Sequence, residues 1–244
     1  AEGAVHAWIE FGNRLLTFVL LITALAAVIF SIKYSKNLIN KIRIRTLALL
    51  QLLGILGQGV LGGITVLTDL HPLPVAGHFL LSIFLISGAI SLRYEMVGVV
   101  KEAAVGLAKP ILPLLIWLTL FVLIAGTIVT GSGPHAGDEQ AQRFGFDPRV
   151  VSWLHADLVI ALLVLTSMLF LITRQIGLTI INKRVGLFLL ICLAQGLVGY
   201  VQYFTGLPVV LVAIHLLGAT LVWVSGWSLV KVADSGFKLK GFQL

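Results

Sequence analysis

Residues 57–68 read GQGVLGGITVLT, and residues 194–205 read AQGLVGYVQYFT. The two stretches match without a gap when the chain is shifted by 137 positions, and each leads into another apolar run with a histidine near its start. The matching pairs are Gln58 and Gln195, Gly59 and Gly196, Gly62 and Gly199, Thr68 and Thr205, and His78 and His215. Five matches in one register indicate an internal duplication, and duplicated membrane proteins commonly place their functional site between the repeats.

The composition is that of an integral membrane protein. Hydrophobic residues make up 59% of the 244 residues and charged residues 11%, with a mean hydropathy of +1.06, whereas soluble domains have about 25% charged residues. About 20 apolar helical residues cross a membrane. Seven runs are long enough to do so: 8–32, 46–70, 76–97, 110–133, 149–173, 184–206 and 208–231. The predicted fold class is therefore an all-α integral membrane protein with seven transmembrane helices in this chain.

Positive charges gather at alternate connections. Fourteen of the 17 Lys and Arg residues lie around the first, third and fifth connections or in the C-terminal tail. The positive-inside rule makes these segments cytoplasmic. We therefore predict a multi-pass protein of the plasma membrane with its N-terminus outside and its C-terminus in the cytoplasm. The net charge of +7 then reflects topology in a membrane lipid environment, and no nucleic-acid partner is expected.

The duplication predicts two pseudo-symmetric four-helix bundles. Four apolar runs belong to the second repeat, but only three precede it. We therefore expect a further helix before residue 1, which would give eight helices in the full-length protein. The expected division is an N-terminal half-bundle of three helices in residues 1–105 and a C-terminal four-helix bundle in residues 106–244.

Three polar side chains lie in the first apolar run. Glu10, Asn13 and Arg14 fall within the stretch WIEFGNRLLTF, residues 8–18, although a charged side chain at the membrane centre costs about 2.5–3.5 kcal/mol. Glu10 and Asn13 are three residues apart and so share a helix face. Because intramembrane ionisable residues are functional by default, this face is a candidate site; the alternatives are a Glu10–Arg14 pair and a helix-end hydrogen bond from Asn13.

Three histidines lie at one depth in the membrane, close to that of Asn13. His78, His155 and His215 each fall about one or two turns below the outer end of their helix. Imidazole binds zinc, copper or heme iron, but no HExxH motif or cysteine cluster is present to complete a zinc site. Two imidazoles from facing helices suit heme, whose tetrapyrrole supplies four further iron ligands. His155 and His215 are such a pair. The alternative for each histidine is that it is a hydrogen-bonded residue of the protein core.

Glycines accompany this pair of histidines. Gly196, Gly199 and Gly218 lie on the two helices of the second repeat. They would allow a macrocycle to lie close to the backbone, or they serve as small residues where two membrane helices cross.

Four motifs occur in order along the chain: IEFGNR at 9–14, TGSGPHAGD at 130–138, WLHAD at 153–157 and AIHLLGA at 213–219. With this topology and duplication, the chain resembles the heme A synthase family, and specifically its actinobacterial-type members, over essentially its whole length but without the family's first helix. The resemblance implies an enzyme, an oxidoreductase that converts heme O to heme A by oxidising a porphyrin methyl group to a formyl group for the terminal oxidase.

The resemblance also implies two heme sites. The C-terminal bundle would hold heme b through His155 and His215, and the N-terminal half would hold the substrate heme O. Glu10 would be catalytic, through proton transfer or by stabilising a cationic intermediate. The remaining residues of the substrate site would be Asn13, Arg14, which could pair with a heme propionate, and His78, a candidate iron ligand.

This chain departs from the family at one ligand position. The family motif has a histidine where this sequence has Asn13, so the N-terminal half offers one imidazole, His78, at the two ligand positions of the family pattern. An iron that lacks one strong axial ligand has a vacant or weakly held position, which suits oxygen chemistry. The expected partners are heme O, the heme O synthase that supplies it and cytochrome c oxidase assembly proteins; the electron donor, the source of the formyl oxygen and the oligomeric state are left open.

Two other classes of protein explain part of the pattern. A transmembrane b-type electron-transfer cytochrome explains the histidines but gives Glu10 no role. A transporter explains the duplication, but the internal prolines Pro110, Pro113 and Pro208 fall near the ends of the apolar runs and do not break them.

Cysteine labelling tests the predicted topology. With Cys192 replaced, cysteines placed at Lys36 and Lys101 should react with a membrane-impermeant reagent only from the cytoplasmic side, because both positions lie in the basic connections. A cysteine at Asp138 should react only from outside. Labelling of Asp138→Cys from the cytoplasmic side alone would reverse the orientation.

Overall fold

The computed structural model describes residues 2–36, 38–134 and 141–234, and for residues 2–10 and 14 it describes the helical backbone alone. Seven helices in these ranges are long and apolar enough to cross a membrane. They are α1 (Glu2–Tyr34), α2 (Lys41–Leu67), α3 (Pro72–Val97), α4 (Ala108–Ser132), α5 (Pro148–Gln175), α6 (Thr179–Phe204) and α7 (Val209–Val232). The prediction of an all-α membrane protein is confirmed.

Helix boundaries follow local chemistry. Pro72 and Pro148 occupy the first turns of α3 and α5, where no backbone N–H is needed. Asp147 caps α5 by accepting a hydrogen bond from the backbone N–H of Arg149 at 2.8 Å. His71 caps α3 in the same way, through its Nδ1 atom and the N–H of Leu73.

Four helices begin a turn or more before the predicted apolar runs, among them α1 at Glu2 and α3 at Pro72. α2 starts at Lys41 and α6 at Thr179, about one turn before the predicted starts at residues 46 and 184. The added turn of α2 has three basic residues, and that of α6 has Asn182 and Lys183. These polar side chains lower the hydropathy of the sequence without opposing a helix. A long basic side chain in such a turn can place its charge at the membrane surface while its carbon chain stays in the apolar layer. The helix can therefore begin before the apolar run does.

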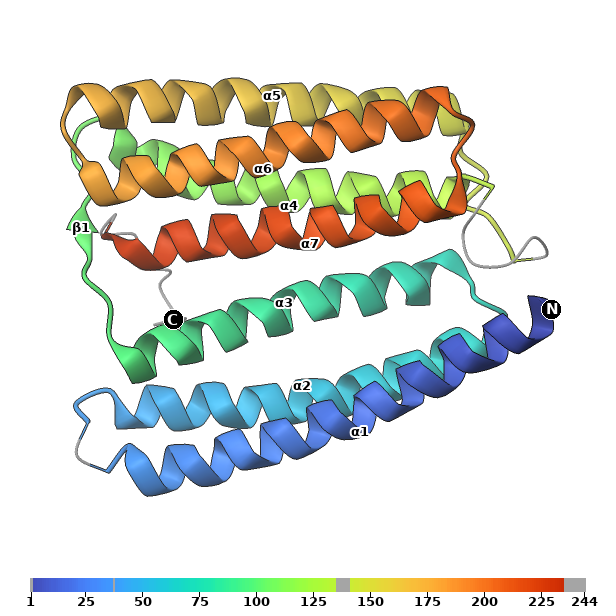
Figure 1. Cartoon of the computed structure of the whole chain (residues 1–244), viewed down its shortest axis with the longest axis horizontal. Coiled ribbons are helices and arrows are strands. Elements are labelled where there is room, and N and C mark those ends of the chain that lie inside the picture. Colours follow the sequence, from blue (N-terminus) through green and yellow to red (C-terminus); the bar gives the residue numbers. More distant parts are fainter. Residues whose placement is uncertain (1, 37, 135–140, 235–244) are drawn as a thin grey trace.

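The helices lie side by side as antiparallel neighbours (Figure 1). α4, α5, α6 and α7 pack in a closed ring, because α4 contacts both α5 and α7, and α6 contacts both α5 and α7. α1, α2 and α3 follow in a row, with α2 packed between α1 and α3. α3 joins this row to the ring through contacts with α7 and α4. The predicted boundary at residues 105 and 106 falls in the connection between the row and the ring.

Connections alternate between the two ends of the molecule (Figure 1). The α1–α2, α3–α4 and α5–α6 connections and the end of α7 share one end, which is the end where the sequence places most basic residues. There the two-residue strands β1 (Glu102–Ala103) and β2 (Ala233–Asp234) pair in parallel. Glu102 also accepts a hydrogen bond from the backbone N–H of Ile181, so the α3–α4 connection is tied to both α6 and the end of α7.

The best-packed core lies inside the ring of α4 to α7. Leu115, Leu169, Phe188 and Leu229 are fully buried there. Large apolar side chains remain exposed on the outer faces of the helices, including Phe18 and Ile22 of α1. This distribution is expected of a protein whose outer surface contacts lipid chains.

Two tryptophans of α7 join the ring to α3. The indole Nε1 of Trp223 donates to the hydroxyl of Ser87 at 2.8 Å, and that of Trp227 donates to Ser91 at 3.1 Å. The indoles are stacked, with ring centroids 5.7 Å apart. Because they lie one turn apart on α7 and their partners lie one turn apart on α3, the two bonds set the register of the two helices.

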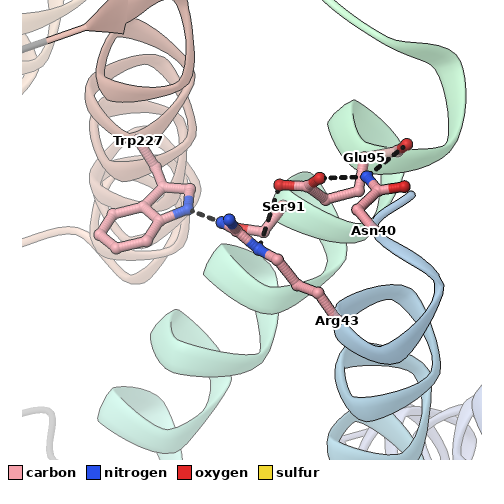
Figure 2. A network of polar contacts seen from close by, with 5 residues as sticks. All are labelled: Asn40, Arg43, Ser91, Glu95 and Trp227. Carbon is pink, nitrogen blue, oxygen red and sulfur yellow. Dashed lines mark hydrogen bonds and ion pairs between the residues drawn. The ribbon is translucent and has the colours of Figure 1, made fainter. Parts of the chain in front are cut away.

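A polar network extends from this contact to α2 (Figure 2). Glu95, one turn beyond Ser91 on α3, forms an ion pair with Nε of Arg43 at 3.1 Å. The same carboxylate accepts a short hydrogen bond from the side-chain amide of Asn40. The start of α2, the end of α3 and α7 are therefore held together by neighbouring side chains.

A double-mutant cycle tests the contact between α3 and α7. Trp223→Phe and Ser87→Ala should each lower the free energy of unfolding in detergent, and their coupling should be about 0.6–1.7 kcal/mol, as for other interhelical hydrogen bonds in membranes. The bond is buried, so competition from water is small. A coupling of zero would show that it contributes nothing to the joining of α3 and α7.

Candidate functional site

A cavity of about 390 Å³ lies between α3 and the ring of α4 to α7. Apolar side chains form much of its wall, with Val122, Leu162 and Val222 coming from three different helices. Its polar lining residues include Ser82, Gln195, Gln202, His78, His155 and His215. An apolar cavity with a few convergent polar groups is the usual form of a small-molecule or cofactor site.

Three histidines from three helices line this one cavity. His78 is on α3, His155 on α5 and His215 on α7. The sequence predicted His155 and His215 as a pair in the C-terminal bundle, and both line the cavity. His78 was assigned to a separate site in the N-terminal half, yet it lines the same cavity, because α3 packs directly against α4 and α7.

Each histidine ring packs against a glycine of the neighbouring helix. A methyl group added to Gly62, Gly126 or Gly199 would lie 3.6, 3.3 or 3.0 Å from Cε1 of the facing histidine. The facing rings are those of His78, His155 and His215, respectively. In each hairpin the glycine therefore makes room for an imidazole between two helices.

The histidine rings have unused hydrogen-bonding capacity. The Nδ1 atoms of His78 and His215 are buried and have no hydrogen-bond partner in the described part of the chain. The Nδ1 atom of His155 is also buried, and its nearest polar contact is the backbone of Val122, which does not reach full hydrogen-bond geometry. Buried polar atoms are nearly always paired in folded proteins. The three Nδ1 atoms lie on the side of each ring that faces the neighbouring glycine, so the protein leaves the hydrogen-bonding capacity of these imidazoles largely unused beside one cavity.

Two glutamines bind the helices that carry histidines. Nε2 of Gln58 donates to the backbone oxygen of His78 at 2.9 Å, and Nε2 of Gln195 donates to that of His215 at 2.6 Å. These glutamines are matching positions of the repeat, but their residue type alone does not predict a hydrogen bond to a backbone carbonyl. The signal was present, since each glutamine precedes by four residues the glycine that faces the same histidine.

The structure separates the roles of the three glycines near the His155–His215 pair. Gly199 faces the ring of His215, and Gly218 faces the side chain of Gln195, so both are small residues where helices meet. Gly196 lines the cavity and has nothing within 4 Å of an added methyl group. It is therefore the one of the three beside which a flat cofactor could approach the backbone.

The residues predicted on the first helix are not brought to this cavity. Asn13 is exposed on α1, and the cavity is lined by residues of α3 to α7. The side chains of Glu10 and Arg14 lie outside the described part of the structure. A substrate site formed by Glu10, Asn13, Arg14 and His78 therefore remains a prediction.

The fold and the cavity define a polytopic membrane protein in which an apolar cavity is lined by histidines from three helices. Residues 1–225 match the family described as cytochrome oxidase assembly protein, COX15-CtaA. The chain belongs to this family, which confirms the resemblance to heme A synthases, and it has a role in cytochrome oxidase assembly. Searches of curated proteins and of solved structures found no match.

Proposed function

We propose that this protein is a heme A synthase, which oxidises the methyl group of heme O to the formyl group of heme A. One observation carries the proposal: His155 and His215, on two helices of the closed ring, line one apolar cavity, and each ring fits against a glycine of the neighbouring helix. Membership of an oxidase assembly family supports the same conclusion. The proposed location is the plasma membrane, with the N-terminus outside.

The donor set and the wall of the cavity fit heme b. His155 and His215 would be its two axial ligands, and the exposed backbone at Gly196 would allow the macrocycle to lie close to α6. Val122, Leu162 and Val222 would exclude water from its faces. Bound heme b would supply an iron that accepts and donates single electrons.

The substrate heme O is assigned to the N-terminal side of the cavity. His78 lines the cavity from α3, and we assign it as the candidate ligand of the substrate iron. Arg14 would pair with a propionate through charge-assisted hydrogen bonds, and Glu10 would move a proton or balance positive charge during the oxidation. The family pattern assigns two imidazoles of this half to the substrate heme. Because this chain has Asn13 at one of these positions, His78 is the one that remains.

The position of His78 supports electron exchange between the two hemes. It shares the cavity with His155 and His215, so a heme bound at His78 would be a neighbour of heme b. The expected partners are the enzyme that supplies heme O and proteins of oxidase assembly. Identification of the hemes extracted from the purified protein separates this function from that of a b-type electron carrier: a mixture of heme b with heme O or heme A indicates the synthase, and heme b alone indicates the carrier.

Substitution of the paired histidines tests the heme b site. His155→Ala and His215→Ala should each abolish the low-spin heme b absorption spectrum, because each variant removes one of two axial ligands. His71→Ala is the matched control, since His71 caps α3 outside the cavity, and it should retain the spectrum. Retention of the full spectrum by both cavity variants would refute the ligand assignment.

Substitution of Glu10 tests the catalytic assignment. Glu10→Ala should retain heme b but strongly lower the ratio of heme A to heme O in membranes, because the proposed proton-transfer group is lost. Glu10→Gln keeps the shape and hydrogen bonding but loses the charge, so a comparable defect is expected. Normal heme A production by Glu10→Ala, at normal protein level and without another synthase, would exclude a catalytic role.

A further inference from the structure

We propose that Gln195 is a positioning residue that fixes His215 in the orientation required to bind heme b. This inference rests on the proposed function, because it assigns Gln195 a role toward the heme ligand. Gln195 acts from α6 by hydrogen-bonding the backbone of His215 on α7. It is not assigned contact with reacting atoms.

The first observation is a hydrogen bond between two helices. Nε2 of Gln195, on α6, donates to the backbone oxygen of His215, on α7, at 2.6 Å. A carbonyl inside an α-helix already accepts one backbone hydrogen bond, and its second lone pair is available to a side chain. The bond therefore joins the two helices at the residue that carries the proposed ligand.

The second observation is the place of Gly199 on the same helix. Gly199 follows Gln195 by four residues, so both lie on one face of α6. An added methyl group at Gly199 would lie 3.0 Å from Cε1 of His215. Gln195 thus holds the backbone of His215 while Gly199 receives its ring, and the two contacts together restrict both the rotation of α7 and the orientation of the imidazole.

The same arrangement occurs in the first repeat. Gln58 donates to the backbone oxygen of His78 at 2.9 Å, and Gly62 faces the ring of His78. Gln58 also donates to the hydroxyl of Ser82 at 2.6 Å. Recurrence 137 positions apart, with the same donor, acceptor and glycine, indicates a device that accompanies the histidine and not an incidental contact.

The third histidine provides a contrast inside the molecule. His155 also packs against a glycine, Gly126, but the residue four positions before that glycine is Val122, which has no donor in its side chain. Loss of the Gln195 amide should therefore disturb one of the two proposed axial ligands and leave the other in place. The expected result is an altered heme environment with heme still bound.

Gly218 allows the same contact to be disturbed from the opposite helix. A methyl group added to Gly218 on α7 would overlap Oε1 of Gln195. Gly218→Ala should therefore push the amide away from the carbonyl of His215. Alanine has a higher helix propensity than glycine, so this substitution does not destabilise α7 itself. A change in the heme spectrum could therefore not be attributed to a less stable helix.

The experiment compares the purified heme-loaded protein with Gln195→Met, Gly218→Ala and the double variant. Methionine keeps the length of glutamine but has no donor. Each single variant should bind heme, show a shifted low-spin absorption and electron paramagnetic resonance signal, and lose heme to apomyoglobin about 10-fold faster, within the range for residues that orient a metal ligand. The double variant should resemble the single variants, because both remove the same hydrogen bond.

Gln51→Ala is the matched control. Gln51 is a buried glutamine of α2 that packs against Gly88, and the described hydrogen bonds give its amide no histidine partner. It should retain the wild-type signal and the wild-type rate of heme loss. Equal spectral shifts in Gln51→Ala and Gln195→Met would show a general packing effect and overturn the inference.

The outcomes separate the inference from the proposed function. Gln195→Met and Gly218→Ala could both show the wild-type spectrum and the wild-type rate of heme loss, with or without lower thermal stability. In that case Gln195 serves only to join two helices, and the heme assignment is unaffected. If Gln195→Met does not fold, the spectrum of Gly218→Ala decides in the same way. Absence of bound heme from the wild-type protein would overturn both proposals.

Discussion

The structure depends on the demand that buried polar groups be hydrogen-bonded where water is absent. The backbone meets this demand within each helix, which is why the apolar runs form seven long helices. Side chains must meet it between helices. Trp223 and Trp227 do so by donating to Ser87 and Ser91, and these bonds attach α7 to α3. The position of α3 beside the ring, and with it the entry of His78 into the cavity, follows from this attachment.

The helical hairpin is the repeated unit of the site. In α2–α3, α4–α5 and α6–α7, a glycine on the first helix faces a histidine on the second. The glycine has no side chain to fill the space between the helices, so the imidazole can occupy it. In two of the hairpins a glutamine also binds the backbone of the histidine. Packing and ligand placement are therefore served by the same few positions.

Most of the fold could be predicted because hydropathy and length decide where a chain can cross a membrane. The predictions were poorest at the helix starts, because polar residues there lower the hydropathy without ending the helix. The first turn of α2 has three basic residues and that of α6 has Asn182 and Lys183, yet both are helical. The candidate site could be predicted in part. His155 and His215 were singled out by depth and by the repeat. Gln195 could be seen only as a matching position of the repeat, because its acceptor is a backbone carbonyl, which every residue of α7 has.

The sequence by itself determined the class of protein, the seven membrane-spanning helices of the described residues, the duplication and the candidate histidines. Each of these depends on composition or on spacing along the chain. Only the tertiary structure decided which histidines share a cavity and what each glycine faces. His78 belongs to the first repeat by sequence, but it lines the cavity of the second repeat because α3 packs against α4 and α7. Contacts between helices depend on rotation and approach in three dimensions, and the order of residues along either helix alone does not specify these.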